Sequence, residues 1–170
     1  MMGSGKTTVG TLLAQRLGYS FIDTDAVIEQ VTQRSIPEVF AQDGEAAFRE
    51  IETQVLGHVV SHVRMVIATG GGLAAQVENW RYLQHGVVVW LDASPEILYQ
   101  RLQGDRTRPL LQNENPYQRL VDLLEERRSR YTQADLHITI AEDESPEQTA
   151  DRIIEAVRGI LKPSSVLPQS

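Results

Sequence analysis

The stretch Gly3-Ser4-Gly5-Lys6-Thr7-Thr8 decides the fold of this chain, because it leads directly into an amphipathic helical pattern over residues 7–17. The full phosphate-binding motif reads G-x-x-x-x-G-K-[ST], and this stretch supplies its second half. Glycines let successive backbone N–H groups turn toward phosphate oxygens, and the following helix presents its positive end. Lys6 would reach the β- and γ-phosphates, and the Thr7 hydroxyl would ligate Mg²⁺. The pattern favours a nucleotide site over a flexible Gly/Ser-rich terminus.

Outward from this loop, short apolar segments alternate with longer amphipathic ones, which predicts α/β architecture with a mostly parallel sheet. Ser94, Asn115 and Ser145 each precede a proline, a pattern typical of helix starts. The expected strands are Tyr19–Ile22, Met65–Ala68, Val87–Leu91 and Leu136–Ile140. The expected helices lie near 7–17, 25–33, 44–62, 95–103, 116–133 and 146–161.

The composition bounds the function classes. The chain has 170 residues, a formal net charge of −7 and no cysteine, which excludes disulfides, thiolate metal sites and a cysteine nucleophile. The acidic balance argues against general nucleic-acid binding. We find no signal sequence and no apolar run near the ~18 residues of a membrane span, so we expect a cytoplasmic protein without a membrane partner.

Two carboxylates follow the first expected strand in Phe21-Ile22-Asp23-Thr24-Asp25. Open α/β sheets bind ligands at this end of their strands, and alternation along an extended segment points both aspartates the same way. One could hold a water on Mg²⁺ and the other could accept a proton from a substrate hydroxyl. The alternative is that Asp25 only caps the next helix.

Further candidates lie later in the chain. Gly70, Gly71 and Gly72 follow the strand Met65–Ala68 and would let a ligand approach the backbone closely. Helical spacing does not distinguish Arg49 from a solvated arginine, nor does it choose between Arg127 and Arg128. The four histidines show no shared ligand spacing, so no zinc site follows. The segment Gly104–Asn115 is either a surface loop or a lid that brings arginines onto a bound anion.

Taken together, G-S-G-K-T-T, F-I-D-T-D, F-R-x-x-E, G-G-G, R-P-L-L and an arginine four residues before a tyrosine resemble the shikimate kinase family in order and spacing over roughly residues 1–160. The resemblance implies an α/β P-loop fold of the nucleoside-monophosphate-kinase type, a three-layer sandwich with a parallel sheet. It also implies a single kinase domain over 1–161 with a lid at about 104–115, and a flexible tail at 162–170. The implied reaction moves the γ-phosphoryl group of ATP, with Mg²⁺, to the 3-hydroxyl of shikimate in the shikimate pathway of aromatic amino-acid biosynthesis, in a protein expected to be a monomer.

The resemblance also implies a role for each site residue. Lys6, Asp25 and Arg108 would be catalytic, and Thr7 and Asp23 would hold the magnesium ion. The ATP site would be formed by Gly3, Ser4, Gly5, Lys6, Thr7, Thr8, Arg101 and Arg108, with further adenine contacts near Glu144–Pro146. The shikimate site would be formed by Asp25, Arg49, Gly70, Gly71, Gly72 and Arg127, since two arginines can fork onto one carboxylate.

Two rivals remain: another small-molecule kinase on the same scaffold, such as a gluconate kinase, and a kinase-derived binding protein without catalysis. A further expectation concerns the sheet, because a phosphate loop normally follows a buried central strand. We find no such strand ahead of Met1, and we expect four strands of a five-stranded sheet, with a gap beside the strand that ends at Asp23. We expect the chain as it stands to be poorly soluble or inactive unless about eight residues are added ahead of Met1, since strands are typically ~5–6 residues long.

Overall fold

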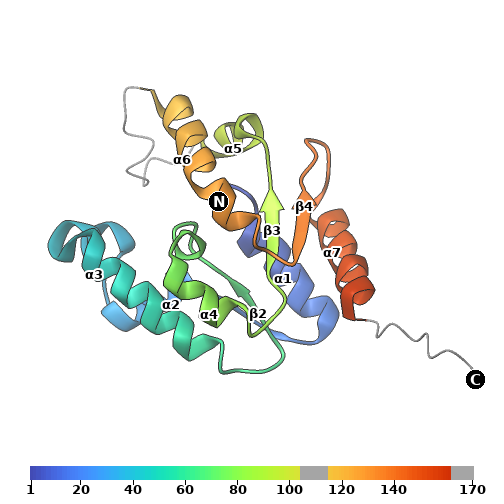
Figure 1. Ribbon diagram of the computed structural model, residues 1–170, viewed down its shortest axis with the longest axis horizontal. Coiled ribbons are helices and arrows are strands. Elements are labelled where there is room, and N and C mark those ends of the chain that lie inside the picture. The colour runs from blue at the N-terminus through green and yellow to red at the C-terminus, as the bar shows by residue number, and fades with distance from the viewer. Residues whose placement is uncertain (104–114, 162–170) are drawn as a thin grey trace, which may run out of the picture.

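The computed structural model describes residues 1–103 and 115–161, in which helices alternate with short parallel strands (Figure 1). No helix in these two ranges is long and apolar enough to cross a membrane. The strands are β1 (Ser20–Asp23), β2 (Met65–Ala68), β3 (Val89–Asp92) and β4 (Leu136–Thr139). The helices are α1 (Lys6–Leu17), α2 (Thr24–Thr32), α3 (Ile36–Val59), α4 (Trp80–Leu83), α5 (Pro95–Leu102), α6 (Pro116–Tyr131) and α7 (Pro146–Leu161), with the 3₁₀ turns η1 (Leu73–Ala75) and η2 (Val77–Asn79).

The four strands form two separate parallel pairs, β1 with β2 and β3 with β4. The expected gap in the sheet is therefore present, and all four strands lie within two residues of their predicted positions. Its expected place, beside the strand that ends at Asp23, was wrong. The gap does not lie between β1 and β2, because these two strands pair along their whole length. Val66 of β2 packs against the core that contains β3 and β4, which places the break between β2 and β3. Strand pairing depends on contacts distant in sequence, which hydrophobic patterns do not report.

Two hydrophobic cores correspond to the two strand pairs. Helices α2, α3 and α4 gather around β1 and β2, whereas α5, α6 and α7 gather around β3 and β4 (Figure 1). Helix α1 contacts both sides, since it packs against α7 and against both β1 and β2. Burial of these apolar faces positions the loops at the carboxyl ends of the strands, where the register sets Asp23 beside Ala68.

Helix α3 begins earlier than the periodicity predicts. Ser35 and Glu38 form a reciprocal capping box that starts the helix at Ile36, and the helix ends at Val59 instead of residue 62. At Gly44 the backbone has φ 81° and ψ 173°, a conformation that favours glycine, so the helix is kinked there. The apolar pattern of residues 44–62 therefore predicted only the part beyond the kink.

Candidate active site

The phosphate loop leads into α1 as the motif predicts. Gly5 is the residue before the helix and has a left-handed backbone (φ 86°, ψ 16°), and Gly3 is also left-handed (φ 73°). The Ser4 hydroxyl, which is buried, donates to the carbonyl of Met1 at 2.9 Å. The Lys6 ammonium also donates to this carbonyl, at 2.6 Å. These bonds hold the loop closed over the start of α1 and place a cation at the helix N-terminus, where anions bind.

Thr7 and Asp23, the two residues predicted to hold a magnesium ion, lie in direct contact. The Thr7 hydroxyl donates to Asp23 Oδ2 at 2.7 Å, while Asp23 Oδ1 accepts a hydrogen bond from the backbone N–H of Asp25 at 3.1 Å. Asp23, not Asp25, is therefore the residue that caps α2, so the capping alternative for Asp25 was wrong. A hydroxyl and a carboxylate are hard oxygen ligands that suit Mg²⁺, which binds through one or two carboxylates plus substrate phosphates and needs no protein cage. The donor set fits this ion.

A cavity of about 260 Å³ lies beside the phosphate loop. Gly3, Ser4, Gly5 and Thr8 line one side, and Ile140, Glu144, Pro146 and Thr149 line the other, together with Arg101. Arg101 Nη1 lies 3.4 Å from the Gly3 carbonyl, which fixes the arginine against the loop. The cavity brings together the phosphate loop, Arg101 and the segment near Glu144–Pro146, the three parts of the sequence that were predicted to form the ATP site.

Each of the three glycines after β2 lies against one predicted substrate residue. A Cβ atom built on Gly70 would lie 2.7 Å from Asp25 Oδ1, and one on Gly72 would lie 2.2 Å from Arg49 Nη1. A Cβ on Gly71 would lie 3.3 Å from Arg127 Nη1. The triple glycine is thus the surface around which one carboxylate and two guanidinium groups converge. A side chain at 70 or 72 would displace them.

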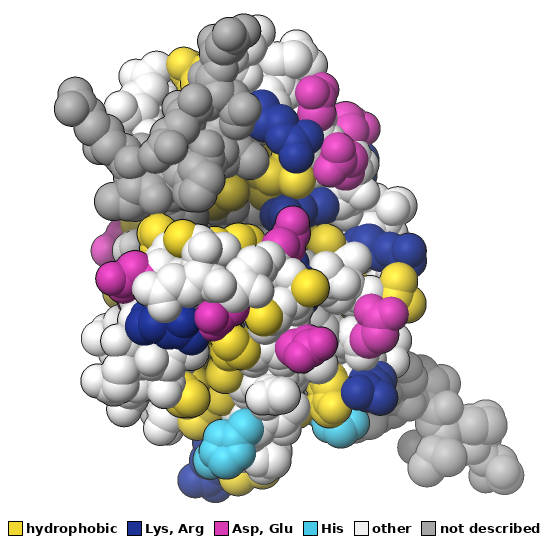
Figure 2. Space-filling view, turned by 90° about the vertical axis from the view of Figure 1, so that its left-hand side faces the viewer, with side chains coloured by type: hydrophobic (Ala, Val, Ile, Leu, Met, Phe, Trp, Pro, Cys, Tyr) yellow, Lys and Arg dark blue, Asp and Glu magenta, His cyan; other side chains and the backbone are white. Residues whose placement is uncertain are grey.

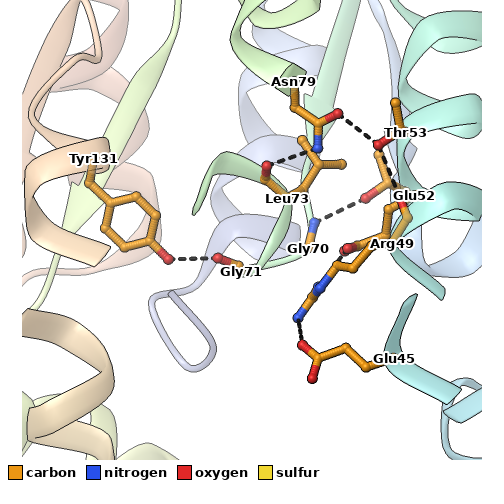
Figure 3. Close-up of polar contacts among 10 residues, drawn as sticks. Glu45, Arg49, Glu52, Thr53, Gly70, Gly71, Leu73, Asn79 and Tyr131 are labelled. Carbon is orange, nitrogen blue, oxygen red and sulfur yellow. Dashed lines mark hydrogen bonds and ion pairs between the residues drawn. The ribbon is translucent and has the colours of Figure 1, made fainter. Parts of the chain in front are cut away.

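Arg49 is held by two carboxylates of its own helix (Figure 3). Its Nη1 donates to Glu52 Oε2 at 2.6 Å, and its Nη2 donates to Glu45 Oε1 at 2.9 Å. Burial raises the pKa of the Glu52 carboxyl above its ordinary value, and the negative charge of Asp25 acts in the same direction. Burial acts to lower the pKa of Arg49, but the hydrogen bonds to the two glutamates outweigh it and raise this pKa.

Arg127 and Arg128 point to different places. Arg127 is half-buried beside Gly71, whereas Arg128 is exposed and pairs with Glu125 at 3.3 Å. The structure therefore brings Arg127 to the site and leaves Arg128 on the outer surface of α6. Figure 2 shows Lys and Arg side chains close to Asp and Glu side chains and to apolar ones on one face of the molecule.

Supporting residues that the sequence did not single out hold the glycine segment. The Tyr131 hydroxyl donates to the Gly71 carbonyl at 2.7 Å, and the buried Thr24 hydroxyl accepts from the Gly70 N–H at 3.0 Å (Figure 3). The buried Asn79 side chain bridges the Leu73 carbonyl and the Thr53 hydroxyl. Thr24 and Tyr131 both stood in motifs quoted from the sequence, but neither was given a role there, and Asn79 stood in none.

Part of the predicted site falls outside the residues that the structure describes. Arg108 and the other residues of the expected lid from 104 to 114 lie outside the described residues, as does the tail from 162. The four histidines are exposed, and residues 1–103 and 115–161 contain no cluster of three or more His, Asp or Glu side chains that could hold a metal ion.

A family model described as shikimate kinase matches residues 2–158. The chain belongs to the shikimate kinase family. It is 58% identical to a shikimate kinase of Synechococcus elongatus over 165 residues, which cover 97% of this chain and 87% of the relative. It is 54% identical to one from Trichormus variabilis, over 95% of this chain and 90% of the relative. A solved shikimate kinase from Acinetobacter baumannii in complex with shikimate superposes with a TM-score of 0.88 at 42% identity, covering 95% of this chain and 91% of that one. The corresponding enzyme from Aquifex aeolicus gives 0.81 at 34% identity, covering 94% of each chain.

The family confirms several expectations from the sequence. The fold is the P-loop fold of the nucleoside-monophosphate kinases, and the chain is a kinase, a transferase that uses ATP and Mg²⁺. The alternative that the chain is a binding protein without catalysis is not supported, because shikimate kinases are enzymes. The individual roles of the site residues stay predictions.

Proposed function

We propose that this chain transfers the γ-phosphoryl group of ATP to the 3-hydroxyl of shikimate. The observation that carries the proposal is the convergence of Asp25, Arg127 and Arg49 on Gly70, Gly71 and Gly72. Shikimate has one carboxylate and three hydroxyl groups. Two guanidinium groups suit the carboxylate, and an aspartate beside an open backbone suits the hydroxyls.

The phosphate loop lies beside the carboxyl end of β1, next to this acid-binding site. Thr7 of the loop is hydrogen-bonded to Asp23 of β1, and Asp23 is two residues before Asp25. A substrate held by the arginines would therefore present its hydroxyl toward Lys6 and the nucleotide. Phosphoryl transfer needs this positioning and charge neutralisation more than covalent help from the protein.

Within this proposal the residues have separate tasks. Lys6 neutralises charge on the transferred phosphoryl group, and Asp25 accepts the proton of the attacking hydroxyl. A magnesium ion held through Thr7 and Asp23 would supply further positive charge at the phosphates. Arg108 would add a positive charge from the lid. If so, Arg108→Ala should lower kcat. The cavity lined by Arg101, Glu144 and Pro146 would take the adenine ring.

An assay of ADP release with shikimate, quinate and gluconate side by side tests the proposal. Activity with shikimate alone supports it, and a preference for gluconate would move the chain to another small-molecule kinase. A Lys6→Met variant is the negative control, and it should lose ADP release with every acceptor. We further propose that the protein acts as a cytoplasmic monomer without nucleic-acid or membrane partners, since the site is built entirely from one chain. Sedimentation velocity with and without both substrates would test the monomer.

A further inference from the structure

We propose that Glu45 is an internal competitor of the acidic substrate, which must displace its carboxylate from Arg49 in order to bind. The inference rests on the proposed function, because it assigns Arg49 to the substrate carboxylate. Glu45 therefore acts as a residue that sets the affinity for the acid.

The two carboxylates on Arg49 differ in how firmly they are held. The side chain of Glu52 is 2% exposed, whereas that of Glu45 is 69% exposed. Glu52 is enclosed by the core of α3 and by Gly70, whose Cβ position lies 2.8 Å from Glu52 Oε1. Withdrawal of Glu52 would leave a partly buried guanidinium group without its nearest countercharge, which is costly. Glu45 can swing into solvent, because exposed ion pairs contribute little to stability.

The position of Glu45 in α3 allows this movement. It directly follows Gly44, where the backbone leaves helical geometry, and so it begins the helical run that carries Arg49 four residues later. It lies over the Nη2 atom of Arg49, while Nη1 is already engaged by Glu52. The Arg49 Nε atom is buried, so a substrate carboxylate that forks onto the guanidinium group must approach its Nη end, where Glu45 lies against Nη2.

Charge balance gives the sign of the effect. Arg49 carries one positive charge and contacts two carboxylates, so an approaching carboxylate meets a site that is already neutralised or negative. Removal of the Glu45 charge should strengthen the binding of an acid and leave the nucleotide site unchanged. A simple surface ion pair would instead leave substrate affinity as it was.

The experiment compares Glu45→Gln with Glu50→Gln. Both variants remove one negative charge from the same helix, but Glu50 is exposed, and the hydrogen bonds and ion pairs of the Arg49 guanidinium group in the described residues go to Glu45 and Glu52 instead. We expect Glu45→Gln to lower the KM for shikimate about two- to fivefold at low salt, in line with the strength of exposed ion pairs. The KM for ATP and kcat should not change, and the gain should shrink as ionic strength rises. Glu50→Gln should have little effect.

The outcomes separate this inference from the proposed function. If the unaltered protein does not phosphorylate shikimate, the proposed function fails before Glu45 is tested. If it does, an unchanged or higher KM in Glu45→Gln overturns the inference alone. An equal gain in both variants would also overturn it, because it would reflect net charge and not competition for Arg49. Isothermal titration calorimetry of shikimate with each folded variant checks that the KM change is a change in affinity.

Discussion

The hydroxyl of Tyr131 donates a 2.7 Å hydrogen bond to the backbone carbonyl of Gly71, and this bond joins α6 to the glycine segment (Figure 3). Helix α6 also carries Arg127, whose guanidinium group lies beside the same glycine. Burial raises the pKa of the Tyr131 hydroxyl, which keeps it protonated and able to donate. One buried bond therefore sets the distance between two sides of the predicted substrate site.

Substitution of Tyr131 by phenylalanine should raise the KM for shikimate several-fold and leave the KM for ATP unchanged. The change removes only the hydroxyl and leaves the partly buried Gly71 carbonyl without that donor, at a cost of about 1 kcal/mol in stability. Steady-state kinetics with each substrate varied in turn, together with thermal unfolding, would separate the two effects. Tyr82→Phe is the matched control, since its hydroxyl accepts a bond from Arg81 away from the site. A loss of stability with both KM values unchanged would mean that Tyr131 is purely structural.

Replacement of Arg127 by alanine should weaken shikimate binding by about 1.5–3 kcal/mol, the range for hydrogen bonds to charged groups. Arg49→Ala should have a similar effect, and ATP binding should change little in either variant. Arg128→Ala is the control, because Arg128 is exposed and pairs with Glu125. Calorimetric titration of shikimate would measure all three. Loss of binding in the Arg128 variant with binding intact in the Arg127 variant would reverse the assignment.

The contrast between these two arginines shows how far the sequence leads. Helical periodicity left the choice open, and only the family motif, an arginine four residues before Tyr131, selected Arg127. The approach of Arg127 to Gly71 joins residues 56 positions apart, and no local pattern encodes such a contact. Strands and capped helices were predictable because their signals, apolar runs and Ser-Pro or Asn-Pro pairs, are local.

Other features were missed for identifiable reasons. The start of α3 carried a local signal in Ser35 and Glu38, but the apolar periodicity beyond Gly44 was stronger. The turns η1 and η2 are short, and they depend on the buried Asn79, whose partners lie in η1 and α3. The gap in the sheet was expected, but its place depends on which strands pair, and pairing is a property of non-local hydrogen bonding. Glu52 was within the quoted F-R-x-x-E motif, yet its burial became visible only in the packed structure.

Substitution of Thr7 by valine should increase the Mg²⁺ concentration needed for half-maximal activity and lower kcat. Valine keeps the shape of threonine but removes the hydroxyl that bonds Asp23 at 2.7 Å and that is predicted to ligate the ion. Thr7→Ser retains the hydroxyl and should restore most of the activity. Magnesium titrations of ADP release at saturating shikimate would test both variants. Equal magnesium dependence in all three proteins would remove Thr7 from the metal site.

The pKa shifts of Glu52 and Glu38 predict opposite effects of pH on stability. Burial raises the pKa of Glu52 in the folded protein above its ordinary value of 4.5, so this carboxyl takes up its proton at a higher pH in the folded protein than in the unfolded chain. The resulting stabilisation is complete below the unfolded pKa and is lost as pH rises through the folded pKa. Hydrogen bonds from Ser35 lower the pKa of Glu38, so its contribution is present above its unfolded pKa and is lost as pH falls through the folded one.

Urea unfolding between pH 3 and pH 8, a range chosen to span both shifts, would reveal these slopes. The free energy of unfolding of the unaltered protein minus that of Glu52→Gln should decrease as pH rises, and the same difference for Glu38→Gln should increase. Each glutamine variant lacks the titrating group, so each difference isolates one carboxyl. A difference for Glu52→Gln that increases with pH would mean that the ion pair with Arg49 outweighs burial. Arg49 would then hold Glu52 ionised in the folded protein, and the pKa of that carboxyl would be lowered instead of raised.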